Sequence, residues 1–85
     1  MKIILCLPWK HSPEREMVRE NWEMNDIDGN KIGYIIKYDD SHYYYRGSAK
    51  GSSINGYAKT AARAKAIIEQ SVKIKIVNDR LKNLL

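Results

Sequence analysis

The stretch HYYYRGSAKGSS holds the residue types with the clearest chemical potential. Tyrosine rings are platforms on which nucleic-acid bases stack. If this stretch is a strand, Tyr43 and Tyr45 point to one face of a sheet and Tyr44 points to the other. Should a helix cover the Tyr44 side, Tyr43 and Tyr45 would lie open and could bind bases. The alternative is that the tyrosines pack on a half-buried strand with their hydroxyls at its rim.

A basic, glycine-rich segment follows the tyrosines. The ten residues GSAKGSSING hold three of the five glycines and read as a loop that carries Lys50 to the start of a helix. Lys59 and Arg63 would lie one turn apart on that helix, and a helix N-terminus favours anions. With Arg46, these cations form the predicted site for an anionic partner. A plain flexible connection explains the glycines equally well.

Two better-known loop motifs fail in this chain. Gly51 and Gly56 have the glycine spacing of a nucleotide-binding P-loop, but Tyr57-Ala58 stands where a Lys-Ser/Thr pair must follow. The stretch DIDGN resembles the start of a calcium-binding EF-hand loop. That loop needs Gly at its sixth position and Glu at its twelfth, where this chain has Lys31 and Lys37. We therefore expect neither nucleotide hydrolysis nor calcium binding.

Cysteine and histidine are too sparse to indicate catalysis. Cys6 is the single cysteine, which excludes an internal disulfide or a multi-cysteine zinc site and fits a reducing cytoplasm. His11 and His42 have no third partner at a recognisable spacing, so we expect no enzyme activity, cofactor or metal. The apolar run at residues 3–7 is shorter than the roughly 7–15 residues of a signal peptide. We expect neither secretion nor a membrane span.

The chain length predicts one small domain over residues 1–85, and its strand and helix patterns predict the α+β class. With 44% hydrophobic residues and no Phe, the core must be thin. Such a domain would gain stability from a homo-oligomer or a bound partner.

Alternating apolar residues predict a three-stranded antiparallel meander. Its strands lie at residues 18–25, 31–38 and 42–46, with turns at Asp28-Gly29-Asn30 and at residues 39–41. Residues 31–38 carry apolar side chains on both faces, which favours the central position. The segment MKIILCL is a candidate fourth strand.

A C-terminal helix is predicted to begin near Gly56 and to include residues 58–69. Its apolar face would hold Tyr57, Ala61, Ala64 and Ile68, with Ser53 or Asn55 as the N-cap. Residues 71–77, SVKIKIV, fit a strand or a helix, and continuity favours the helix narrowly. The segment NDRLKNLL would then add an apolar stripe at Leu81, Leu84 and Leu85. Ser12-Pro13-Glu14 is typical of a helix start, so a short N-terminal helix is also predicted.

The net charge of +5 is unevenly distributed. Residues 1–45 hold six Lys and Arg against eight Asp and Glu, whereas residues 46–85 hold nine against two. A basic half of this kind favours an anionic partner, although a solvated helix face is the competing explanation.

Two resemblances bear on function. Trp22, Asp28-Gly29-Asn30, Tyr43-Tyr44, Gly51 and Ala58-Lys59-Thr60 resemble a pattern in small phage and prophage proteins over roughly residues 20–70. That resemblance implies a meander followed by one helix, and a role in acting on host machinery. Double-stranded RNA-binding domains are similar in element order and in a basic segment that enters the last helix, but their adjacent lysines are missing here.

The leading interpretation is a cytoplasmic, non-enzymatic accessory protein in a bacterial host cell. Its basic C-terminal half would bind nucleic acid. The alternative is a protein inhibitor, such as an anti-defence or host-takeover factor, that docks the same cations on an acidic host protein.

Overall fold

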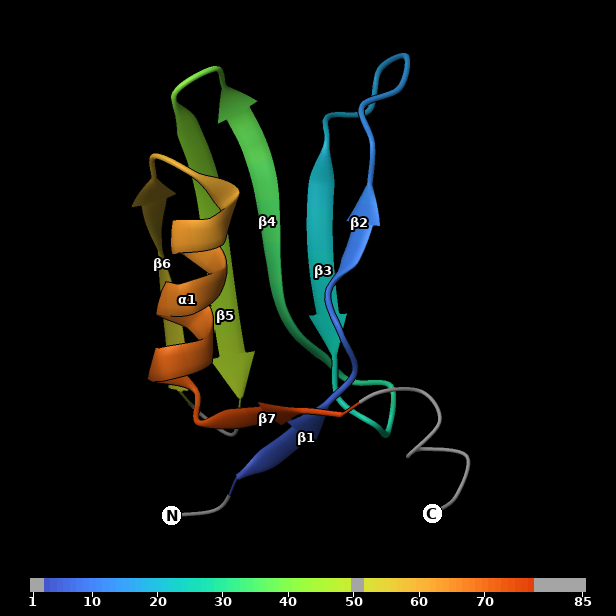
Figure 1. Ribbon diagram of the computed structural model, residues 1–85, viewed down its shortest axis with the longest axis vertical. Coiled ribbons are helices and arrows are strands. Elements are labelled where there is room, and N and C mark those ends of the chain that lie inside the picture. Colours follow the sequence, from blue (N-terminus) through green and yellow to red (C-terminus); the bar gives the residue numbers. More distant parts are fainter. Residues whose placement is uncertain (1–2, 50–51, 78–85) are drawn as a thin grey trace.

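The computed structural model describes residues 3–49 and 52–77 and shows an α+β fold (Figure 1). A five-stranded antiparallel sheet in the order β2-β3-β4-β5-β6 carries one helix, and β1 and β7 form a second, two-stranded parallel sheet. The strands are β1 (Ile4–Cys6), β2 (Lys10–Ser12), β3 (Asn21–Asn25), β4 (Lys31–Asp39), β5 (His42–Ala49), β6 (Ser52–Ala58) and β7 (Ile74–Ile76), and the helix is α1 (Ala61–Ser71). The sheet is thus larger than the predicted meander.

The β3–β4 hairpin agrees with the prediction. β4 is the central strand, and Trp22 and Met24 on β3 are buried, although Val18 lies before the strand and is exposed. Gly29 adopts a φ of 92°, which glycine tolerates at no steric cost. The hairpin therefore has the turn that its sequence predicts.

The side chain of Asp26 holds this turn together. Its carboxylate accepts hydrogen bonds from the backbone N–H of Asp28 and of Asn30 at 2.9 and 2.8 Å, and from the Asn30 amide at 3.0 Å. Desolvation raises the pKa of Asp26, but these hydrogen bonds outweigh it and hold the pKa below its usual range.

A second hairpin, β5–β6, stands where the sequence predicts a loop. Lys50 and Gly51 lie outside the described residues. The strands on either side of them pair continuously, from the Ala49–Ser52 pair to the Tyr43–Ala58 pair. The prediction of a loop from Gly47 to Gly56 is therefore wrong. The glycines have a packing role instead: a Cβ on Gly47 would lie 3.2 Å from Ile68 Cγ2, and one on Gly56 would lie 2.7 Å from the Tyr45 hydroxyl.

The helix begins later than the sequence predicts. Thr60 is its N-cap and accepts a hydrogen bond from the Arg63 N–H at 3.1 Å, whereas both predicted caps, Ser53 and Asn55, lie within β6. Ala64 and Ile68 are buried as predicted. Tyr57 belongs to β6 and not to the helix.

Both ends of the described chain differ from prediction. Residues 74–76 form β7, so the narrow preference for helix beyond Ser71 is wrong. The helix ends at Ser71 with Val72 as its C-cap, and β-branched residues favour the strand that follows. β7 pairs with β1, so MKIILCL does supply a strand, but outside the main sheet. Leu81, Leu84 and Leu85 lie outside the described residues.

The predicted N-terminal helix is replaced by a hairpin. β2 pairs with β3, and an isolated bridge joins Arg15 to Val18 across a tight turn. Met17 in that turn has a φ of 65° and a side chain that is 99% exposed. Positive φ is uncommon for a residue with a side chain other than Asn or Asp.

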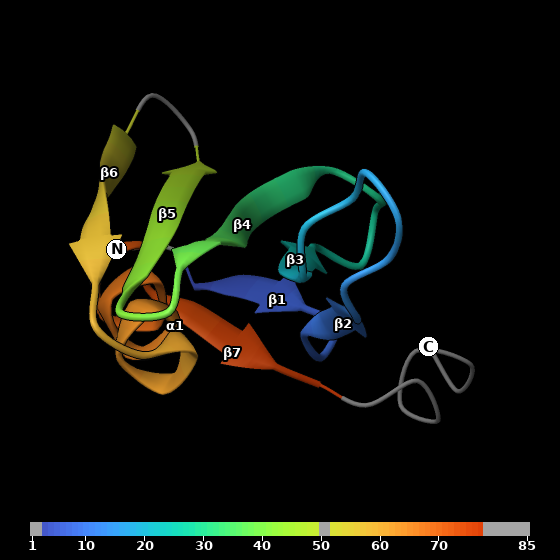
Figure 2. The ribbon, with the colours of Figure 1, turned by 90° about the horizontal axis from the view of Figure 1, so that it is seen from above.

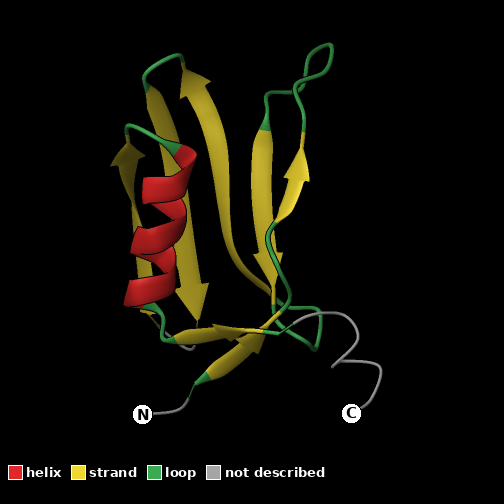
Figure 3. Ribbon diagram, viewed as in Figure 1, coloured by secondary structure: helices red, strands yellow, loops and turns green. Residues whose placement is uncertain are grey.

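The core lies between the sheet and α1. Trp22, Ile35, Ala58, Ala64, Ile68 and Val72 form one buried cluster, and Cys6, Met24 and Ile32 form a second beside β1. Figure 2 shows α1 on one side of β4, β5 and β6. No helix or strand of the described chain covers the opposite side, and we call that side the open face (Figure 3).

Candidate functional site on the open face

The strand register aligns two cross-strand rows on the open face. Residues in register share a face, and successive residues of a strand alternate between faces. The first row consists of Asn21, Ile36, Tyr44 and Tyr57, and the second of Glu23, Tyr34, Arg46 and Asn55. The helix packs on the other face of the sheet, where Ile68 lies against Gly33 and Gly47.

Four tyrosines form a connected cluster on this face. Tyr44 lies between Tyr34 and Tyr57, with ring centroids 6.2 and 5.4 Å away, and Tyr57 contacts Tyr38 at 5.7 Å. Tyr38 and Tyr57 are 55% and 57% exposed. The cluster is an aromatic surface open to solvent.

Cations flank the tyrosine cluster. The Arg19 guanidinium lies 5.5 Å from the centre of the Tyr38 ring and donates to the Tyr38 carbonyl, and the Lys31 ammonium lies 5.8 Å from the centre of the Tyr34 ring. Arg46 lies beside Tyr34 in the second row. An anionic chain that contacted the tyrosines would therefore meet positive charge on several sides.

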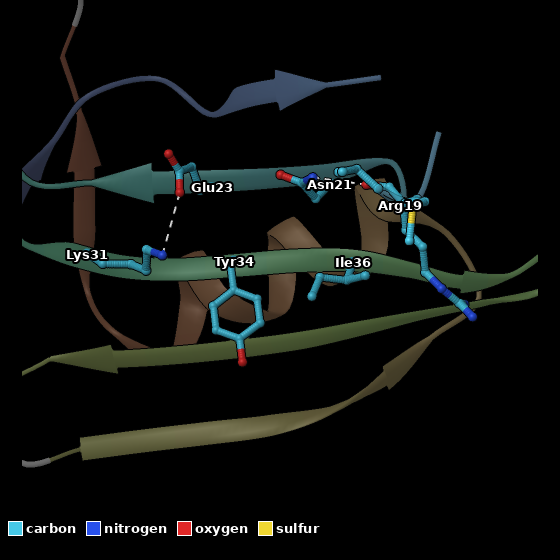
Figure 4. Close-up of a pocket in the computed structure, with 8 residues that line it drawn as sticks. Arg19, Asn21, Glu23, Lys31, Tyr34 and Ile36 are labelled. Carbon is cyan, nitrogen blue, oxygen red and sulfur yellow. Dashed lines mark hydrogen bonds and ion pairs between the residues drawn. The ribbon is translucent and has the colours of Figure 1, made fainter. Parts of the chain in front are cut away.

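A shallow groove of about 630 Å³ adjoins the cluster (Figure 4). It is lined by Met17, Val18, Arg19, Asn21, Glu23, Lys31, Tyr34 and Ile36. Figure 4 shows Glu23 on β3 and Lys31 on β4 joined by an ion pair, with Tyr34 next to them on the same side of the sheet. Glu23 is the one carboxylate in the two rows.

The two tyrosines predicted as base-binding residues lie on the other face. Tyr43 and Tyr45 are half-buried and pack against the helix-covered core, and the Tyr43 ring lies 5.8 Å from that of Trp22. The helix covers their side of β5 and leaves the Tyr44 side open. Tyr43 and Tyr45 would have been open only if the helix covered the Tyr44 side. The helix covers their own side instead, so the prediction that they face solvent is corrected.

Of the predicted cations that the structure describes, Arg46 and Arg63 lie on different surfaces. Arg46 lies on the open face, whereas Arg63 is exposed on α1, behind the sheet. Lys59 lies in the connection from β6 to α1, and Lys50 is outside the described residues. Within residues 46–49 and 52–77, Arg46 and Arg63 therefore do not belong to a single basic patch.

Sequence reasoning missed Tyr34, Tyr38, Tyr57, Arg19 and Lys31 as site residues. Alternation in KIGYIIKY does place Tyr34 and Tyr38 on one face, so part of the signal was present. The position of Tyr57 was not predicted, because the sequence of the strand that carries it predicts a loop followed by a helix.

Two histidine–carboxylate pairs lie outside the tyrosine cluster. The His42 ring lies 3.0 Å from the Asp39 carboxylate, and a backbone hydrogen bond from Ser41, followed by the contact with His42, lowers the pKa of Asp39. His11 contacts Glu20 at 2.8 Å and stacks on Trp22, on the helix side. Within the part of the chain that the structure describes, no three His, Cys, Asp or Glu residues gather as metal ligands would.

No helix among the described residues has the length and hydrophobicity to span a membrane.

Comparisons with protein-family models, with curated proteins and with solved structures gave no match to this chain. The resemblance to phage and prophage proteins stays a prediction.

Proposed function

We propose that this protein is a non-enzymatic, cytoplasmic binding protein whose open face binds single-stranded nucleic acid. The observation that carries the proposal is the cluster of four tyrosines on the open face, flanked by Arg19, Lys31 and Arg46. Sheet-borne aromatic residues beside cations are the usual means of holding unpaired bases and their phosphates.

The geometry favours a single strand over a duplex. A base can lie on a tyrosine ring only when its face is free, which duplex pairing and stacking prevent. Each stacked base contributes about 1–3 kcal/mol, and cations add affinity that depends on salt. The tyrosine hydroxyls and the Asn55 amide offer hydrogen bonds without demanding one sequence.

Binding to fluorescently labelled twelve-nucleotide strands, measured by anisotropy, tests the proposal. Tyr44 is central to the cluster, so Tyr44→Leu should weaken binding about tenfold, as expected for the loss of one stack. Tyr44→Phe retains the ring and should bind as the unmodified protein does. Thermal melting of both variants controls for loss of the fold.

Two results would count against nucleic acid. If the protein binds no strand and no duplex even at low salt, the proposal fails. If an affinity pull-down from bacterial lysate retains one protein equally with and without nuclease, the open face docks on a protein, and the inhibitor interpretation replaces ours.

A further inference from the structure

We propose that the groove beside Tyr34 is a guanine-selective subsite, in which Tyr34 stacks the base and the Glu23 carboxylate binds its Watson–Crick edge. This inference rests on the proposed function and adds a base preference to it. Its starting point is the position of Glu23. A carboxylate repels phosphate, yet this one lies in register with Tyr34, on the face that carries Arg46 and Lys31.

Side-chain placement suits a base that enters edge-on. Glu23 and Tyr34 are directly opposite on neighbouring strands. Figure 4 shows the Tyr34 ring turned toward β5, with the Lys31 ammonium between it and the Glu23 carboxylate, so a base stacked on the ring reaches the carboxylate with its edge, across the space that Lys31 occupies. Ile36 supplies an apolar wall to the same groove.

The hydrogen-bonding pattern of the bases selects guanine. Two carboxylate oxygens accept best from two adjacent donors, and the guanine N1–H and N2–H₂ groups are adjacent on one edge. Adenine and cytosine each place an acceptor nitrogen next to their amino group, and uracil places a carbonyl on each side of its N3–H. Each of these would set a lone pair against the carboxylate.

The Lys31 ammonium occupies the space between the Glu23 carboxylate and the Tyr34 ring. Its ammonium lies 3.6 Å from the Glu23 carboxylate and 5.8 Å from the centre of the Tyr34 ring. Lys31 is 60% exposed, and exposed ion pairs contribute little to stability. A base could therefore displace it at low cost, and its long stem would let the ammonium move to the adjoining phosphate.

Binding to four twelve-nucleotide RNA strands tests the inference. Three strands alternate adenine with guanine, inosine or cytosine, and the fourth is all adenine. None of them is self-complementary by Watson–Crick pairing, so each stays single-stranded and every binding register offers the varied base. We expect the guanine strand to bind about tenfold more tightly than the adenine strand, as for a two-bond base contact. Inosine, which lacks the 2-amino group, should fall between them.

The variant Glu23→Gln separates recognition from simple charge. A glutamine amide has only one acceptor, so the guanine strand should bind less tightly, while the adenine strand should bind as well as before or better because a negative charge is gone. Glu20→Gln is the matched control, since Glu20 pairs with His11 on the other face and its loss should preserve the guanine preference.

Equal affinity of the unmodified protein for all four strands would overturn the subsite while leaving the proposed function intact. So would a Glu23→Gln variant that bound all four strands more tightly by the same factor, because Glu23 would then act only through its charge. Absence of binding to every strand would overturn the proposed function and the subsite with it.

Discussion

Arg46 and Arg63 carry the same charge on opposite sides of the sheet, which makes them a matched pair for testing where an anionic chain binds. Arg46 lies in the second row of the open face, between Tyr34 and Asn55, whereas Arg63 is exposed on α1. Two single variants are compared, Arg46→Gln and Arg63→Gln. Each removes one charge and keeps a polar side chain of similar length.

The expected magnitude follows from counterion release. For a single strand, the logarithm of the binding constant falls with the logarithm of salt concentration by about 0.7 for each neutralised phosphate. Loss of the Arg46 contact should reduce that slope by about 0.7. When the salt concentration rises from 50 to 200 mM, both proteins lose affinity. The fold-loss of the variant should be about 2.6 times smaller than that of the unmodified protein.

Fluorescence anisotropy with a twelve-nucleotide single strand at four salt concentrations gives the slope directly. Arg63→Gln should retain the unmodified slope, and urea unfolding should place both variants within about 0.5 kcal/mol of the unmodified protein, as for most surface changes. If Arg63→Gln reduces the slope as much as Arg46→Gln does, the strand does not bind on the open face, and our assignment of the site is refuted.

Three further predictions concern the fold. Ile68 is fully buried against Gly33 and Gly47, so Ile68→Ala should lower the free energy of unfolding by about 3 kcal/mol in urea; a loss below about 1 kcal/mol would contradict its place in the core. Burial, followed by the nearby Asp26 charge, raises the pKa of the Cys6 thiol to about 11, so a disulfide reagent at pH 8 should label it only as fast as the protein opens, and rapid labelling of the folded protein would disagree. The folded-state pKa of Asp26 is lowered, so its contribution to stability is present above the unfolded pKa near 3.8 and is lost as pH falls through the folded pKa. Melting temperatures between pH 2.5 and 6 should therefore fall less steeply for Asp26→Asn, and equal slopes would show that Asp26 does not contribute this dependence.

Prediction from sequence succeeded where local patterns determine the structure. The alternation in KIGYIIKY and the turn at Asp28-Gly29-Asn30 gave the central hairpin, because each depends on residues that are neighbours in the chain. The same local reasoning failed between Gly47 and Gly56. There the glycines make room for Ile68 and for the Tyr45 ring, and these partners are remote in sequence or lie on the neighbouring strand.

The candidate site was only half accessible from sequence. Alternation separates Tyr44 from Tyr43 and Tyr45, but it does not say which side the helix covers. A small-residue signal was available, since Gly47 shares a face with Tyr45 and leaves space for a helix side chain. The cations of the open face come mainly from the acidic half of the sequence, so a count of charge along the chain cannot locate them.

The pairing of β1 with β7 has a consequence for synthesis of the protein. Ile4 pairs with Ile74 and Cys6 with Ile76, so this small sheet joins segments from opposite ends of the described chain. Contacts that close so large a loop form late, after local hairpins. A ribosome delivers Cys6 before Ile74, which packs against the buried cluster that holds Cys6. The thiol that is sealed in the finished protein is therefore exposed to cellular oxidants mainly while the chain is being made.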